Sequence, residues 1–167
     1  YCPTYENGTQ LALIRYPHAG TFEIPIVTVN NKNVSGKRNF GNIQDAIGIN
    51  SKVAERLSGA DFDGDTVVAI PISSKVAVKA TPALRGLKDF DPKTAYAVPE
   101  GNPNGVRLMK KEEKQKEMGI ISNLITDMTL RGAPPEEITR AVKHSMVVID
   151  AEKHKLDYKR SERENGI

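Results

Sequence analysis

The stretch "GADFDGDTVVAIP", residues 59–71, constrains this chain more than any other part of its sequence. Asp61, Asp63 and Asp65 occupy alternate positions, and an apolar run follows them directly. Carboxylates this close repel one another when they are ionised. The apolar run predicts a strand that is buried in a core. The chain must therefore gather three negative charges at the mouth of a buried strand, an arrangement that a bound cation would stabilise.

A hard divalent cation suits these three aspartates, because Mg²⁺ prefers oxygen ligands. Alternate residues of a tight loop can direct three carboxylates to one point, and Gly64 allows the backbone to turn sharply between them. The competing interpretation is a polar hairpin tip. Such a tip needs one or two turn-forming residues, not three alternating acids. The sequence therefore predicts that Asp61, Asp63 and Asp65 bind Mg²⁺, with Mn²⁺ as a substitute.

Two other kinds of acidic loop share part of this pattern. An EF-hand also begins with alternating acids, but it requires glycine at position 6 and a bidentate glutamate at position 12. Thr66 and Ile72 stand at those positions, which excludes the calcium loop. Phosphosugar mutases carry a similar loop, typically followed by an Asp-Arg pair. Here "TVVA" follows and no serine motif precedes, so a metal-dependent phosphosugar enzyme stays open as the weaker alternative.

The stretch resembles the catalytic signature of the largest subunit of multisubunit RNA polymerases. That signature is Asn-Ala-Asp-Phe-Asp-Gly-Asp followed by an apolar strand that ends near a proline. The resemblance covers seven consecutive positions with one departure, Gly59 in place of asparagine. In that family the three aspartates hold the catalytic Mg²⁺ on a loop of a double-psi β-barrel. The resemblance thus implies that Asp61, Asp63 and Asp65 are both the metal ligands and the catalytic residues.

A second element of the same family lies upstream, in "RYPHAGTFEI", residues 15–24. The family has an Arg-x-Pro element before its metal loop, and Arg15 and Pro17 match it. There the arginine reaches the ribose hydroxyls of the substrate or of the RNA end. A planar, permanently charged fork of donors suits that role. The resemblance implies that Arg15 binds substrate; taken alone, it is equally well a surface arginine beside a strand-breaking proline.

The C-terminal third shows a looser likeness to a related group. "KEMGIISNLITDMTL" and "AVKHSMVVIDAEK" are similar to the helices after the catalytic loop in cellular RNA-dependent RNA polymerases, which are single chains with two barrels. The matching positions are Gly119, Asn123, His144, Asp150 and Lys153. This likeness favours a single-chain two-barrel polymerase over a true largest subunit. His144 and Lys153 fit structural roles equally well.

The sequence pattern predicts an α+β fold with a change of character along the chain. Strands are expected in "LALIRYP", "EIPIVTV" and "TVVAIPI", and one helix at 42–48 or at 51–59 with Ser51 as N-cap. Proline and glycine dominate residues 80–106, which predicts an irregular connection. Helices are expected in 110–130 and 134–150. The expected domains are a double-psi β-barrel with its connection in 1–105 and a helical extension in 106–167.

Composition adds weaker expectations. The net charge of +3 and the pI near 8.9 are mild evidence for an anionic partner. No apolar run approaches the length of a membrane span. One cysteine, Cys2, cannot form an internal disulfide, which favours a reducing, cytoplasmic location. The first residue is Tyr1 rather than methionine, so the chain is expected to be a fragment of a longer polymerase.

The resemblance implies nucleotidyl transfer, in which the 3′-hydroxyl of a growing RNA attacks the α-phosphate of a ribonucleoside triphosphate and releases pyrophosphate. The implied partners are a nucleic-acid template, the RNA product, the triphosphates and a second, lysine-bearing barrel from the rest of the chain or another subunit. Without that barrel the fragment is expected to be inactive. The alternative from another class is an inactive single-barrel module that binds nucleic acid or protein. DNA and RNA templates both stay open.

Overall fold

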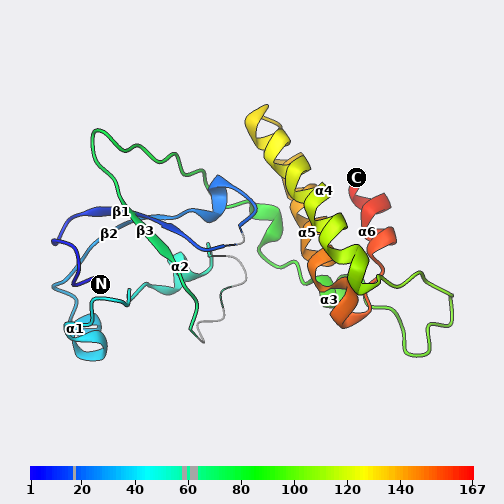
Figure 1. Cartoon of the computed structure of the whole chain (residues 1–167), viewed down its shortest axis with the longest axis horizontal. Helices are drawn as coiled ribbons and strands as arrows, with labels where there is room; N and C mark the ends of the chain where they lie inside the picture. The colour runs from blue at the N-terminus through cyan, green and yellow to red at the C-terminus, as the bar shows by residue number, and fades with distance from the viewer. Residues whose placement is uncertain (17, 58–59, 61–63) are drawn as a thin grey trace. The chain divides into compact units, whose positions relative to one another are not determined.

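The computed structural model describes residues 1–16, 18–57, 60 and 64–167 (Figure 1). The chain forms two compact units, residues 1–83 and 84–167. The first contains a small sheet and short helices, and the second is helical. The α+β class predicted from the sequence is therefore confirmed. The sequence placed its domain boundary after residue 105, whereas the structure groups residues 84–105 with the helices.

A three-stranded antiparallel sheet organises the first unit (Figure 1). Its strands are β1 (Gln10–Ile14), β2 (Ile26–Thr28) and β3 (Val68–Pro71), in the order β2-β1-β3. In register, Leu11 lies opposite Val27 of β2, and Ile14 lies opposite Val68 of β3. β2 and β3 fall within stretches predicted to be extended, and β1 begins one residue before its predicted stretch, at Gln10. Each strand is shorter than its stretch.

Within the described residues the sheet is open, with β2 and β3 as its edges. Closing a sheet into a barrel requires enough strands, tilted and staggered, to bring the last beside the first. Three strands of three to five residues do not do this. The described part of the chain thus shows a small antiparallel sheet and does not show the double-psi β-barrel expected for residues 1–105.

The core of the first unit surrounds the central strand. Leu11, Ala12 and Leu13 are consecutive in β1 and all have 0% exposure, so this strand is covered on both faces. Burial on both faces explains why its sequence is continuously apolar rather than alternating. The side chains that join Leu11 and Leu13 in the buried cluster come from the N-terminus, the end of β2 and the segment after α2: Cys2, Val29 and Leu57.

Two short helices of the first unit are set by asparagine caps. α1 (Val34–Phe40) begins after Asn33, whose side chain accepts a hydrogen bond from the backbone nitrogen of Gly36 at 2.7 Å. α2 (Ser51–Ala54) begins after Asn50, whose side chain accepts from Val53 at 3.0 Å. Asparagine is among the strongest N-cap residues, because its short side chain reaches the free amides of the first turn.

The sequence predicted one helix in this region, at 42–48 or at 51–59, and the structure differs from both predictions in part. The stretch 42–48 forms no helix, and α1, which was not expected, lies before it. The alternative, 51–59, locates α2, but the N-cap is Asn50 and not Ser51. Gly59, the expected end of that helix, lies outside the described residues.

Three helices form most of the second unit: α4 (Lys111–Leu130), α5 (Pro135–His154) and α6 (Tyr158–Asn165). α5 packs against both α4 and α6 (Figure 1). The two long helices confirm the prediction. In the centre of α4, Ile121 and Ile125 are each 2% exposed.

The proline- and glycine-rich connection is irregular, as expected, apart from η2 (Arg85–Leu87) and α3 (Pro92–Ala95). It is nevertheless anchored to the helices. The backbone nitrogen of Asp157 donates to the carbonyl oxygen of Tyr96 at 2.9 Å, and Tyr96 lies in a buried cluster with Leu156 and Tyr158. Among the described residues, no helix has the length and apolarity that crossing a membrane requires.

Candidate metal and substrate site at one end of the sheet

The two sequence elements singled out above meet at one end of the sheet. β1 ends at Ile14, β3 begins at Val68, and these two residues are partners in the antiparallel register. Antiparallel pairing places the C-terminal end of one strand beside the N-terminal end of the other. Arg15 follows β1 and Asp65 precedes β3, so the topology brings together two residues 50 positions apart.

Arg15 and Asp65 form an ion pair at this end of the sheet. Arg15 Nε donates to Asp65 Oδ1 at 2.7 Å, and a terminal guanidinium nitrogen of Arg15 lies 2.6 Å from the same oxygen. The side chains are 20% and 18% exposed. Charge-assisted contacts of this length are among the stronger hydrogen bonds in proteins. Because both groups retain access to solvent, the carboxylate can exchange the guanidinium for another cation.

The remaining predicted ligands, Asp61 and Asp63, lie outside the described residues, as does Pro17. Coordination by three aspartates therefore stays a prediction. Among the described residues no group of three or more His, Cys, Asp or Glu side chains is arranged to hold a metal. Gly64 has a φ of 130°, a conformation that residues with a Cβ rarely adopt. This agrees with the sharp turn expected between the second and third aspartates.

Residues that the sequence did not single out shape the segment after Arg15. Glu23, at the end of η1 (Thr21–Glu23), is only 8% exposed and accepts a hydrogen bond from the backbone nitrogen of Ala19 at 2.7 Å. Arg56 donates to the carbonyl oxygens of Thr81 at 2.8 Å and Phe22 at 3.3 Å. Glu23 bonds a backbone nitrogen four residues earlier, whereas the Arg56 contacts join residues that folding brings near. No sequence motif announces either role.

Two further nitrogen atoms in this unit are buried without a hydrogen-bond partner among the described residues, His18 Nδ1 and Arg56 Nε. His18 belongs to the segment directly after the Arg-x-Pro element, and its ring lies 5.3 Å from that of Tyr16. Buried polar atoms without a partner are uncommon in folded proteins. His18 lies within the stretch 15–24, and no sequence pattern had indicated it as a residue of interest.

The residues of the looser C-terminal likeness do not share one environment. Gly119, Asn123 and Lys153 are exposed, whereas His144 is 4% exposed inside the helical unit. His144 Nδ1 lies 3.0 Å from the hydroxyl oxygen of Ser161, which is fully buried. These observations fit the structural role that the sequence left open for His144.

A buried polar network extends from this histidine. Asn165 Nδ2 donates to the carbonyl oxygen of Ser161 at 2.8 Å and lies 3.3 Å from its hydroxyl, and it reaches the Tyr96 hydroxyl at 3.4 Å. Burial lowers the pKa of His144 and raises the pKa of Tyr96. Both shifts favour the neutral form, as expected where desolvation is the largest cause. We call His144, Ser161, Asn165 and Tyr96 the buried network.

Comparisons of the chain with protein-family models, with curated proteins and with solved structures found no match.

Proposed function

We propose that this chain is the catalytic-barrel portion of an RNA polymerase, and that it supports Mg²⁺-dependent transfer of a nucleotide from a ribonucleoside triphosphate to the 3′ end of an RNA. One observation carries the proposal. Asp65, the last aspartate of the Asp-Phe-Asp-Gly-Asp motif, is ion-paired with Arg15 of the Arg-x-Pro element. Both residues belong to one family pattern, and they lie together at one end of one sheet.

This meeting favours a shared site over two unrelated surface features. The pairing of β1 with β3 brings the arginine of one element beside the third aspartate of the other, 50 positions away. In a nucleotidyl transferase both belong beside the reacting nucleotide. The aspartates hold the metal, and the five N–H donors of an arginine suit neighbouring hydroxyls of a ribose.

The chemistry of the donor set fits magnesium. Asp61, Asp63 and Asp65 offer carboxylate oxygens, the ligand type that Mg²⁺ prefers. When bound, such an ion activates the attacking oxygen and stabilises the charge that develops on the phosphoryl group. Arg15 is the available cation for Asp65 before an ion binds. We propose that, with a metal in place, its guanidinium contacts the substrate ribose.

The proposal includes two parts beyond the described structure. One is a double-psi β-barrel, of which β1, β2 and β3 would be a part. The other is a second barrel that supplies lysines opposite the metal, because stabilising a phosphoryl-transfer transition state depends mainly on positioned charge. The chain alone is therefore expected to fold and to be unable to extend an RNA.

The test is an RNA-synthesis assay with Mg²⁺, the four ribonucleotides and a single-stranded DNA or RNA template. The full-length polymerase should extend RNA, and its Asp61→Ala variant should not. The 167-residue chain should match its own Asp61→Ala control. Lack of synthesis by the full-length protein on either template would contradict the proposed function. Synthesis by the short chain above its control would contradict the need for a second barrel.

A further inference from the structure

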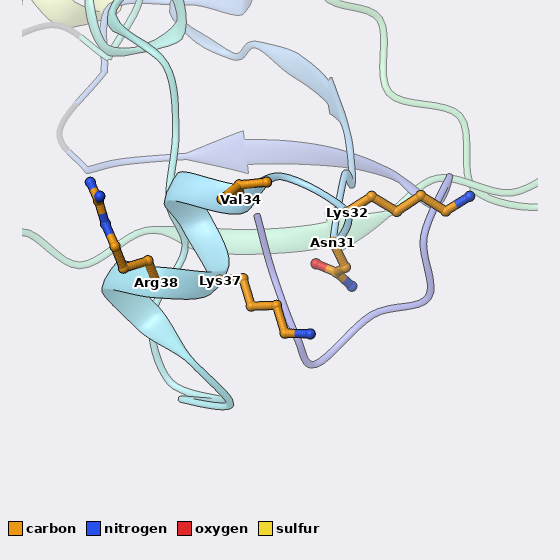
Figure 2. A pocket seen from close by; sticks show the side chains of 5 residues that line it. All are labelled: Asn31, Lys32, Val34, Lys37 and Arg38. Atoms are coloured by element: carbon orange, nitrogen blue, oxygen red, sulfur yellow. The ribbon is translucent and has the colours of Figure 1, made fainter.

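A second cationic feature of the first unit lies between the loop after β2 and α1. There the surface forms an open depression of about 570 Å³, lined by Asn31, Lys32, Val34, Lys37 and Arg38 (Figure 2). Its volume is within the range of small-molecule sites, about 300–1,000 Å³, but such sites are predominantly apolar. Here three of the five lining residues are cations and one is an amide. The lining therefore favours an anionic ligand.

The sequence around the depression has no compensating negative charge. Residues 24–44 contain Lys32, Lys37 and Arg38 and neither aspartate nor glutamate. All three cations are exposed, and none of them forms an ion pair or an aromatic contact with any described residue. We call Lys32, Lys37 and Arg38 the basic patch.

Several other cations of the chain differ from the basic patch because they have a partner within the fold. Arg15, Arg107, Lys159 and Arg160 are paired with carboxylates, and Lys143 lies over the ring of Phe90. Those side chains have partners within the fold that account for their presence. The basic patch has no such partner among the described residues, but neither do Lys111, Lys116 and Lys153 of the helical unit. The grouping of three cations around one depression is therefore what favours an anionic ligand.

The backbone beneath the basic patch is held firmly. Asn31 Nδ2 donates to the carbonyl oxygen of Tyr5 at 2.8 Å, and Asn31 Oδ1 accepts from the backbone nitrogen of Cys2 at 2.9 Å. Gly36 packs so closely that a Cβ there would lie 2.6 Å from the Cβ of Tyr1. Loop and helix are thus fixed to the same N-terminal segment, and the entropy lost on binding is limited to the long side chains.

We propose that the basic patch binds the phosphodiester backbone of a single-stranded RNA. The choice of RNA as the ligand rests on the proposed function. The inference that this surface binds an anion rests on the basic patch alone. A membrane surface fits less well, because Val34 is the only apolar residue in the lining, and interfacial binding requires a larger apolar face.

Three cations set the expected strength of binding. Each phosphate neutralised on a single strand contributes about −0.7 to the slope of log affinity against log salt, so the basic patch contributes a slope of about −2. The interaction should be measurable at low salt and weak at physiological salt. It would hold an RNA strand on the surface of the first unit without reading its sequence.

The test measures fluorescence anisotropy of a labelled single-stranded RNA with the 167-residue chain over a series of KCl concentrations. The variant is Lys32→Glu with Lys37→Glu and Arg38→Glu. The matched control reverses three exposed cations of the helical unit, Lys111, Lys116 and Lys153. We expect the patch variant to lose about tenfold or more in affinity at low salt and about 2 units of slope, and the control to change much less.

Equal losses in the patch variant and the control would overturn the proposal, because net charge alone would then explain binding. The proposal would also be overturned if polyglutamate competed as strongly as unlabelled RNA, because that result would indicate an acidic protein partner. A second patch variant with glutamine at the three positions should also lose affinity, with unchanged circular dichroism. The basic patch is tested by RNA binding and the catalytic proposal by RNA synthesis, so failure of one gives a different result from failure of the other.

Discussion

The polar side chains at the end of the sheet differ from the buried network of the helical unit in charge, burial and choice of partner. Arg15 and Asp65 are charged, about one-fifth exposed, and adjacent to two further acids in the sequence. His144 and Ser161 are 4% and 0% exposed, and their partners are neutral groups of the same unit.

This contrast separates a candidate site from a structural feature. Buried neutral groups that satisfy one another stabilise one packing arrangement and are poorly accessible to a ligand. Partly exposed charged groups can exchange partners when a metal or nucleotide arrives. We therefore expect changes at the sheet end to affect function while leaving stability almost unchanged, and changes in the buried network to do the reverse.

The largest expected effect is that of Asp63→Ala on RNA synthesis by the proposed full-length polymerase. Removing a metal ligand should reduce the rate about 1,000-fold or more, equivalent to about 4 kcal/mol of transition-state stabilisation. The metal-free chain should be as stable as the unchanged protein or more stable, because one of three like charges is removed. The matched control is Asp127→Ala at an exposed position of α4. Synthesis at the original rate would remove Asp63 from the mechanism.

Ser161→Ala should have the largest effect on stability within this comparison. It removes the partner of His144 Nδ1 and one contact of Asn165, and leaves buried polar atoms unsatisfied. The expected loss is about 1–3 kcal/mol in the free energy of unfolding of the helical unit, measured by urea denaturation. Ser122→Ala, exposed on α4, is the control. A loss no greater than that of the control would show that the network contributes little.

Arg15→Lys in the proposed full-length polymerase should reduce discrimination between ribonucleotides and deoxynucleotides about tenfold, or about 1.4 kcal/mol. Lysine keeps the charge but cannot present the planar fork of donors that contacts Asp65 and, as proposed, the ribose. Arg107→Lys, in an exposed ion pair with Glu113, is the matched control. The measurement is the ratio of incorporation efficiencies for the two sugars. An unchanged ratio would reduce Arg15 to a partner of Asp65.

The smallest expected effect is a pH dependence of the helical unit. Burial lowers the pKa of His144 below its ordinary value of 6.5. The unfolded chain therefore binds a proton that the folded chain does not, and stability should fall as the pH decreases below about 6.5 toward the lowered value. Urea denaturation of the unchanged protein and of His144→Gln, near pH 7 and near pH 5.5, tests this. Equal pH dependence in both proteins would assign the effect to other groups.

The sequence predicted most of the helical unit, because α4 and α5 are long and their apolar residues recur at helical spacing. It missed α1 and the asparagine cap of α2, since short helices depend on caps and tertiary contacts more than on local propensity. The packing of Gly36 against Tyr1 is one such contact. The contact between His144 and Ser161 could not be predicted from local sequence patterns either, because it joins two helices.

For the site, the sequence identified Arg15 and Asp65 as members of one family pattern, but the ion pair between them depends on the register of β1 and β3. The supporting contacts of Glu23 and Arg56 involve backbone groups that no side-chain motif records.

The most direct test of the central claim is a titration of the isotopically labelled 167-residue chain with Mn²⁺, followed by amide NMR. The account predicts that amides of residues 61–66 broaden first, at low Mn²⁺ concentrations, and that Asp63→Ala abolishes this selectivity. Binding should be weak, because the triphosphate that would complete the coordination is absent. Broadening that is uniform over the chain, or that begins in the helical unit, would contradict a metal site at the end of the sheet.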